Sequence, residues 1–225
     1  INHPWAATYF DDQVSPAEGT SSEEFYQIYH KFGYDQAVSR ASDSLSYVYR
    51  LDEKYWLMML DSCMCEPVHE TGGKLSEETV AWMKTQLEEA KKQGVTVIPV
   101  SHHNLLDEST LYPEECTIEN TKEVTALLEA YGVPVYLSGH LHLQRIKKHT
   151  SNLNTPGGYG IREIVTSPLP MAPCQYSILN WQADGSLSYH TKKVDIAGWA
   201  QRYGEEDENL LNFDDYADQF LVDVI

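Results

Sequence analysis

The stretch VTVIPVSHHN (residues 95–104) decides the fold, together with its counterpart VPVYLSGHLH (residues 133–142). Each begins with a short apolar run rich in β-branched residues, which is typical of a strand in a sheet covered on both faces. Residues 120–131 carry apolar side chains at helical spacing, and Gly132 ends that pattern. The sequence therefore predicts two parallel strands joined by a helix. A right-handed crossover puts both strand ends at the same sheet edge, where open α/β sheets carry their functional sites.

Other elements are expected on both sides of this unit. Asn120 and Glu123 form a capping-box pattern at the start of the connecting helix, and Ser21 and Glu24 form another at the start of an earlier helix that Gly33 ends. Before the first histidine cluster we expect a hairpin and a further helix, and after the second cluster four strands that suggest an antiparallel region. These elements cover residues 45–60, 76–94, 144–149, 161–166, 175–181 and 187–192.

Both strands of the central unit end in histidine clusters, with His102 in the first and His140 and His142 in the second. Residues two apart in extended chain point the same way, so we expect His140 and His142 to face one point. His102 should join them from the end of the neighbouring strand. Imidazoles that converge in this way point to a transition-metal site, and a single imidazole-rich zinc site is one form that it could take.

The two motifs resemble the later motifs of the calcineurin-like metallophosphoesterases, in which one strand ends in His-His and a later strand ends in Gly-His-x-His. The matching segments here are residues 101–103 and 139–142, in the same order and one strand–helix–strand unit apart. The resemblance extends over residues 1–193. It implies an α/β fold that is part of a four-layer α/β/β/α sandwich with mixed and antiparallel strands.

The same resemblance implies a site and an activity. His102 and His140 would bind one metal ion of a binuclear centre, and His142 would bind the other. The two divalent ions would be Mn, Fe, Zn or Ni, because imidazole ligands suit each of these metals. His103 and Asn104 are candidates for substrate binding or for support of the ligands. The expected reaction is the hydrolysis of a phosphate mono- or diester, with a small phosphate ester as substrate.

The earlier motifs of that family have no good match in this sequence. They are Asp-x-His, Gly-Asp-x-x-Asp/Asn and Gly-Asn-His-Asp/Glu, and the pair Asn2-His3 lacks the flanking residues of the third. By resemblance they supply the other ligands and the histidine that acts as general acid, which we expect upstream of Ile1. Two missing strand–helix units correspond to about 60–100 residues. We therefore expect a C-terminal portion of an enzyme, inactive alone and able to self-associate through an exposed sheet edge.

Composition limits the partners. The formal net charge is −18, with a pI near 4.7, and a field of this sign repels long nucleic acids. No apolar run reaches 18 residues, so the sequence predicts no transmembrane segment. The four cysteines show no pair of CxxC units, and we expect most of them to be free thiols. These features do not indicate a cellular compartment.

Two regions differ in composition. Residues 1–194 read as the C-terminal portion of a metallophosphoesterase domain, and residues 195–225 as an acidic, partly helical extension that contains the run GEEDE (residues 204–208). Two other functions fit the same sequence. One is a mononuclear zinc hydrolase of another family, and the other is a non-catalytic binding module that retains the fold.

Overall fold

A computed structural model of the chain describes residues 7–10, 13–17, 19–64, 70–108, 115–149, 160–182 and 184–224. The chain forms two compact units. The first consists of Ile1–His140 and Ile146–Ile164, and the second of Leu141–Arg145 and Val165–Ile225. The division predicted after residue 194 stays a prediction.

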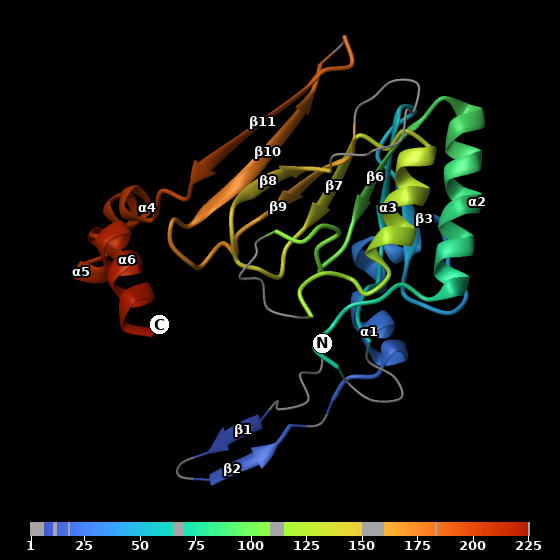
Figure 1. Cartoon of the computed structure of the whole chain (residues 1–225). Coiled ribbons are helices and arrows are strands. Elements are labelled where there is room, and N and C mark those ends of the chain that lie inside the picture. Colours follow the sequence, from blue (N-terminus) through green and yellow to red (C-terminus); the bar gives the residue numbers. More distant parts are fainter. Residues whose placement is uncertain are drawn as a thin grey trace. The chain divides into compact units, whose positions relative to one another are not determined.

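A seven-stranded mixed sheet forms the centre of the first unit (Figure 1). The strand order is β3-β4-β5-β6-β7-β9-β8, so β3 and β8 are its edges. Strands β3, β4 and β5 pair antiparallel, whereas β5, β6 and β7 pair parallel. The predicted hairpin and the predicted parallel pair are therefore confirmed. The strands are β3 (Ala37–Arg40), β4 (Tyr47–Arg50), β5 (Tyr55–Met59), β6 (Thr96–Val100), β7 (Val135–Ser138), β8 (Arg145–Lys148) and β9 (Arg162–Val165).

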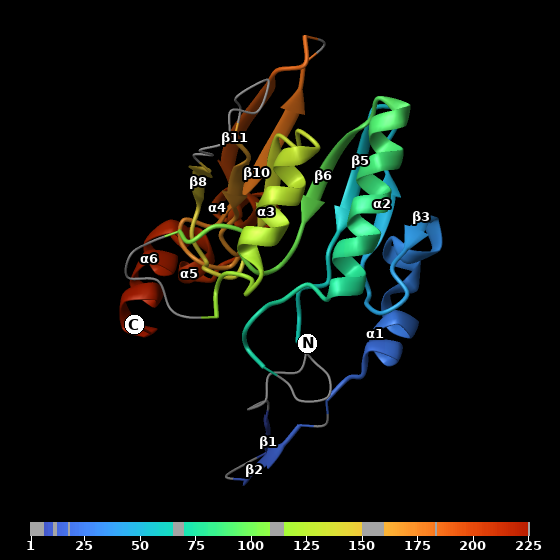
Figure 2. The same cartoon turned by 45° about the vertical axis from the view of Figure 1, so that its right-hand side comes forward.

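Helices α2 (Glu77–Gln93) and α3 (Thr121–Ala130) lie on the same face of this sheet (Figures 1 and 2). The core lies between these helices and the sheet, because each helix turns one apolar stripe toward the strands. The stripes and the strand residues that meet them are almost fully buried. They include Met83, Leu87 and Ala90 of α2, Val124 and Leu128 of α3, and Trp56, Met58, Val97 and Tyr136 of the strands.

The helix ends follow the sequence signals in two cases and depart from them in one. Ser76 caps α2 by accepting a hydrogen bond from the Thr79 amide, and Gly94 ends that helix with a φ of 69°. Ser21 and Glu24 form a complete capping box at α1 (Ser22–Tyr29). The capping box expected at α3 is absent, because the Asn120 side chain makes no capping bond.

The Asn120 side chain binds the backbone of Leu75 instead. Its Oδ1 accepts a hydrogen bond from the Leu75 amide at 3.2 Å, and its Nδ2 donates to the Leu75 carbonyl at 2.9 Å. Both polar atoms of the side chain are thus committed to a distant backbone segment and cannot reach the first turn of α3. A local pattern predicted the cap, and a tertiary contact removed it.

The N-terminal part of the first unit contains a small hairpin and several short helical turns. The hairpin pairs β1 (Ala7–Phe10) with β2 (Gln13–Pro16). Helix α1 is followed by the 3₁₀ turns η1 (His30–Phe32) and η2 (Tyr34–Gln36), with Gly33 between them at a φ of 130°.

The second unit contains a long antiparallel hairpin and three helices. Strand β10 (Gln175–Trp181) pairs with β11 (Leu187–Lys193), and α4 (Ile196–Tyr203), α5 (Glu208–Leu211) and α6 (Phe213–Val224) follow. We expected the four strands after the second histidine cluster to form one antiparallel region, but they divide between two sheets. Strands β10 and β11 form a sheet of their own, whereas β8 and β9 extend the large sheet, and Ile164 and Val165 of β9 are buried.

The α/β class with a mixed sheet flanked by helices is confirmed, and the four-layer arrangement stays a prediction. Cys63, Cys116 and Cys174 are free thiols, as expected, and Cys65 lies outside the described residues. In the described ranges, none of the helices combines the length and the apolar character that crossing a membrane requires.

Candidate active site

His102 and His140 meet at the carboxyl ends of two neighbouring parallel strands. His102 lies two residues after β6 and His140 two residues after β7, and Val100 of β6 is in register with Leu137 of β7. Nε2 of His102 lies 2.9 Å from Nδ1 of His140, and the ring centroids are 4.8 Å apart. His102 is exposed and His140 half-buried, so the pair is open to solvent. Parallel pairing thus brings together two of the three predicted ligands.

The backbone around His140 and His142 differs from the extended chain that we expected. Both residues have left-handed φ values, 64° and 54°. Because β7 ends at Ser138, the chain has already begun to turn when it reaches the histidines. His140 and His142 are therefore not in the extended conformation in which residues two apart face one point. A left-handed conformation costs a non-glycine residue about 1–2 kcal/mol, and such strain is commonest at functional sites.

His142 belongs to the second compact unit, whereas His102 and His140 belong to the first. Its role as a metal ligand therefore stays a prediction.

His103 points into the protein and is 4% exposed. Its Nε2 donates to the carbonyl oxygen of Thr71 at 3.0 Å, because a carbonyl can only accept. Its Nδ1 therefore carries no proton and accepts from the Ser62 hydroxyl at 2.9 Å. Burial lowers the pKa of His103, against the opposing effects of the Thr71 bond and of the Asp61 charge. The ring is thus a neutral anchor between the ends of β5 and β6.

Asn104 is fully buried and ties the two histidine segments together. Its Nδ2 donates to the Ser138 hydroxyl at 2.9 Å and to the Gly139 carbonyl at 3.2 Å. The Gly139 amide in turn donates to the His102 carbonyl at 3.0 Å. The buried side chains of His103 and Asn104 therefore fix the backbone next to the histidine pair. A direct contact of either residue with substrate stays a prediction.

Glu163 of β9 is a buried carboxylate that the sequence analysis missed. Its Oε1 accepts from the Leu105 amide at 2.7 Å and from the Ser138 hydroxyl at 2.6 Å, and its Oε2 accepts from the Leu106 amide at 2.6 Å. Burial raises the pKa of Glu163 to about 7, and the nearby Glu108 charge adds to this, while the three hydrogen bonds oppose it. A sequence signal did exist. Glu163 lies two residues after the apolar Ile161, so in a strand both side chains point to the same face, which should be buried.

Gly73 is a second residue that the sequence analysis missed. It forms β-bridges with Cys63 and with Ile118, so it joins three segments at this edge of the sheet. A Cβ atom built on Gly73 would lie 2.3 Å from Cγ of the His103 ring. Only glycine leaves room for the imidazole at this position.

The histidine pair is chemically and geometrically suited to a metal ion. Two nitrogen ligands with metal–nitrogen bonds of about 2.0–2.1 Å and an angle between 90° and 109° lie roughly 2.9–3.4 Å apart. The observed separation of 2.9 Å falls in that range. In the part of the chain that the structure describes, no group of three or more His, Cys, Asp or Glu residues is placed to hold a metal. The role of His102 and His140 as metal ligands stays a prediction.

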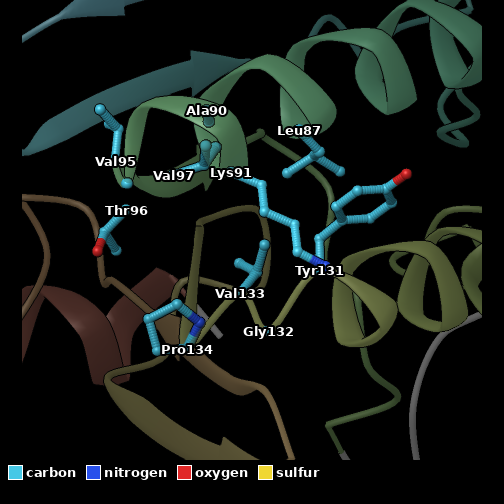
Figure 3. Close-up of a pocket in the computed structure, with 11 residues that line it drawn as sticks. Leu87, Ala90, Lys91, Val95, Thr96, Val97, Tyr131, Gly132, Val133 and Pro134 are labelled. Atoms are coloured by element: carbon cyan, nitrogen blue, oxygen red, sulfur yellow. The ribbon is translucent and has the colours of Figure 1, made fainter.

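The structure also has a cavity of about 280 Å³ away from the histidines (Figure 3). It lies where α2 and α3 end and where β6 and β7 begin, which is the opposite edge of the parallel strands. Lys91 and Tyr131 line it, with Nζ of Lys91 5.7 Å from the centroid of the Tyr131 ring. The cavity therefore takes no part in the histidine site.

Comparison with known proteins gives structural likeness but no sequence match. No protein-family model matches the chain, and no curated protein matches it by sequence. Among solved structures, the chain is similar to the crystal structure of a dimetal phosphatase from Danio rerio, with 14% sequence identity and a TM-score of 0.45. The match covers 57% of this chain and 52% of the zebrafish chain, so this chain spans about half the length of that protein.

Proposed function

We propose that this chain carries part of the active site of a calcineurin-like metallophosphoesterase, which hydrolyses phosphate mono- or diesters at a binuclear metal centre. One observation carries the proposal. The Nε2 atom of His102 and the Nδ1 atom of His140 lie 2.9 Å apart at the carboxyl edge of a parallel pair of strands. The order and spacing of the two histidine motifs support the same reading.

In this proposal His102 and His140 bind one divalent cation through these two nitrogens, and His142 binds a second. When bound, the cations, which are Mn, Fe, Zn or Ni, would supply positive charge to the ester oxygens and lower the pKa of a bound water. For both nitrogens to bind the cation, the imidazole that donates the shared proton must carry that proton on its other ring nitrogen, because a neutral imidazole has a single N–H.

The protein's charge favours a small substrate. The net charge of −18 repels a long polyanion, but bound divalent cations would be the largest local charges and reverse the potential at the site. A small phosphate ester can enter such a site without facing the whole surface. We also propose that copies of the chain associate through an edge of the large sheet, for which β3 and β8 are the candidates.

Metal binding by the intact protein is the decisive test, because we expect the remaining ligands upstream of Ile1. Titration of the intact protein with Co²⁺, followed by its visible absorption, should show two bound equivalents. His102→Ala and His140→Ala should each weaken one equivalent by tenfold or more, and His142→Ala should weaken the other. His190→Ala, which removes an exposed histidine of β11, is the matched control and should change nothing.

The other outcomes select the other functions. A single equivalent that depends on His102 and His140 would favour a mononuclear zinc hydrolase. No specific binding at all would leave a non-catalytic module that retains the fold. Turnover of an aryl phosphate and of a bis-aryl phosphate with added Mn²⁺ then distinguishes monoesterase from diesterase chemistry, and His102→Ala should abolish any turnover observed.

A further inference from the structure

Glu163 receives three hydrogen bonds from the two segments that carry the histidine pair. The Leu105 and Leu106 amides belong to the loop that begins with His102, and the Ser138 hydroxyl lies at the end of β7, two residues before His140. Glu163 itself lies on β9, the strand next to β7 in the sheet. A single buried carboxylate therefore holds both segments.

We propose that Glu163 is a positioning residue of this site, which sets the separation of the His102 and His140 rings by holding the loop after β6 and the end of β7 on one carboxylate. Glu163 touches neither ring. It acts through the backbone after His102 and through the hydroxyl of Ser138.

The hydrogen bonds have one consistent direction. Because the Ser138 hydroxyl gives its proton to Oε1 of Glu163, its oxygen is left to accept from Nδ2 of Asn104. The same amide group donates to the carbonyl of Gly139, the residue before His140. The Gly139 amide then donates to the carbonyl of His102. The hydrogen bonds that begin at Glu163 thus reach the backbone of His102 and the backbone of Gly139, the residue before His140.

No neutral side chain of the same shape as glutamate can accept hydrogen bonds on both of its terminal atoms. A carboxylate offers lone pairs on both oxygens, whereas the amide of glutamine offers one acceptor oxygen and one donor group. In Glu163→Gln the amide oxygen can serve two of the three donors, and the NH₂ group would face the third. The substitution keeps the side-chain volume and removes the charge, so it tests the acceptor pattern and not the packing.

Burying a carboxylate is costly unless its oxygens are hydrogen-bonded, and both oxygens of Glu163 accept hydrogen bonds. An apolar residue at position 163 would leave two backbone amides and one hydroxyl without this acceptor. The carboxylate therefore matches the donors of the two segments that it joins.

The proposal rests on the proposed function only in taking a metal ion as the ligand of His102 and His140. The experiment therefore observes the two imidazoles both in the metal-free protein and in the presence of metal. The first measurement is the imidazole ¹⁵N signals of the metal-free protein at one fixed pH. The unaltered protein should show one donor and one acceptor nitrogen shared between His102 and His140. In Glu163→Gln that signature should be lost while the fold, read by far-UV circular dichroism, persists.

The second measurement is the affinity for Co²⁺. Loss of a group that orients metal ligands typically lowers metal affinity about 10–100-fold, and we expect this for Glu163→Gln. Leu128→Ala is the control, because it removes a fully buried side chain of α3 that contributes to the core but makes none of these hydrogen bonds. It should lower stability and leave both the imidazole signature and the Co²⁺ affinity within about twofold.

The outcomes separate the two proposals. A folded Glu163→Gln with unchanged imidazole signals overturns the positioning role. If the unaltered protein binds no Co²⁺ but the imidazole signature still depends on Glu163, the proposed function fails and the positioning role stands. If Glu163→Gln does not fold, Ser138→Ala decides, since it removes only the hydroxyl between Asn104 and Glu163. An unchanged signature in that variant would also overturn the proposal.

Discussion

The Ser62 hydroxyl lies 2.9 Å from Nδ1 of His103, and both side chains are buried. The Thr71 carbonyl fixes the proton of the ring on Nε2, so Ser62 is the donor and Nδ1 the acceptor. The end of β5 is thereby attached to the loop that carries the candidate metal ligand His102. This contact leads to the first prediction.

Ser62→Ala should lower the free energy of unfolding by about 1–3 kcal/mol, because it leaves a buried acceptor without a donor. A change of tautomer cannot repair the loss, since it would turn the unprotonated Nε2 toward the Thr71 carbonyl. Urea unfolding followed by tryptophan fluorescence measures the effect. Ser42→Ala, at an exposed serine, is the control and should be neutral, and an equal loss in both variants would contradict the assignment.

Gly73→Ala should destabilise the protein by about 1–3 kcal/mol, since the added methyl group would overlap the His103 ring. Gly72→Ala is a matched control one residue away, where the nearest atom to an added Cβ is the flexible end of Met64 at 3.2 Å. Thermal unfolding of the two variants should differ clearly. If both alanines are tolerated equally, His103 does not occupy the position described.

Asn120→Asp distinguishes the observed contact from the cap that the sequence predicts. Aspartate caps a helix as well as asparagine does, so a capping role predicts no loss. In the structure Nδ2 of Asn120 donates to the Leu75 carbonyl, and a carboxylate oxygen there would place two acceptors together. We therefore expect a loss of about 1–3 kcal/mol, similar to that of Asn120→Ala, measured by urea unfolding.

The pH dependence of stability should report the buried Glu163. Its pKa is raised from 4.5 to about 7, so the folded state binds a proton more tightly than the unfolded state. The contribution is therefore fully present below pH 4.5 and is lost as the pH rises through 7. His103 acts in the opposite sense below pH 6.5, because its pKa is lowered and acid favours the unfolded state.

Comparison of the unaltered protein with Glu163→Gln isolates the first effect, since the His103 contribution is common to both. The difference in their free energies of unfolding should fall by about 3 kcal/mol between pH 4.5 and pH 8, because the pKa of Glu163 is raised from 4.5 to about 7. Urea unfolding at a series of pH values gives this difference. A difference that stays constant with pH would show that the pKa of Glu163 is not raised.

The sequence alone was sufficient for most of the elements around the histidine clusters and for one long-range contact, but it did not predict β1, β2 or β3. Helix α2, from its Ser76 cap to Gly94, follows from local hydrogen bonding and apolar spacing, and both depend on neighbours in the chain. The meeting of His102 with His140 was also predictable. A short parallel unit with one helical crossover allows few arrangements, and it places both strand ends at one edge.

Tertiary structure decided what holds those histidines and how their backbone runs. The left-handed turn at His140 depends on where β7 stops pairing, and Asn120 exchanges a local cap for a contact with Leu75, 45 residues away. Glu163 gains its role only when β9 joins the large sheet beside β7. Local patterns record the preferences of neighbouring residues. Burial makes every unpaired polar group costly, so a buried polar side chain must find a hydrogen-bond partner. Only the folded chain determines whether the nearest partner lies in the same segment or in a distant one.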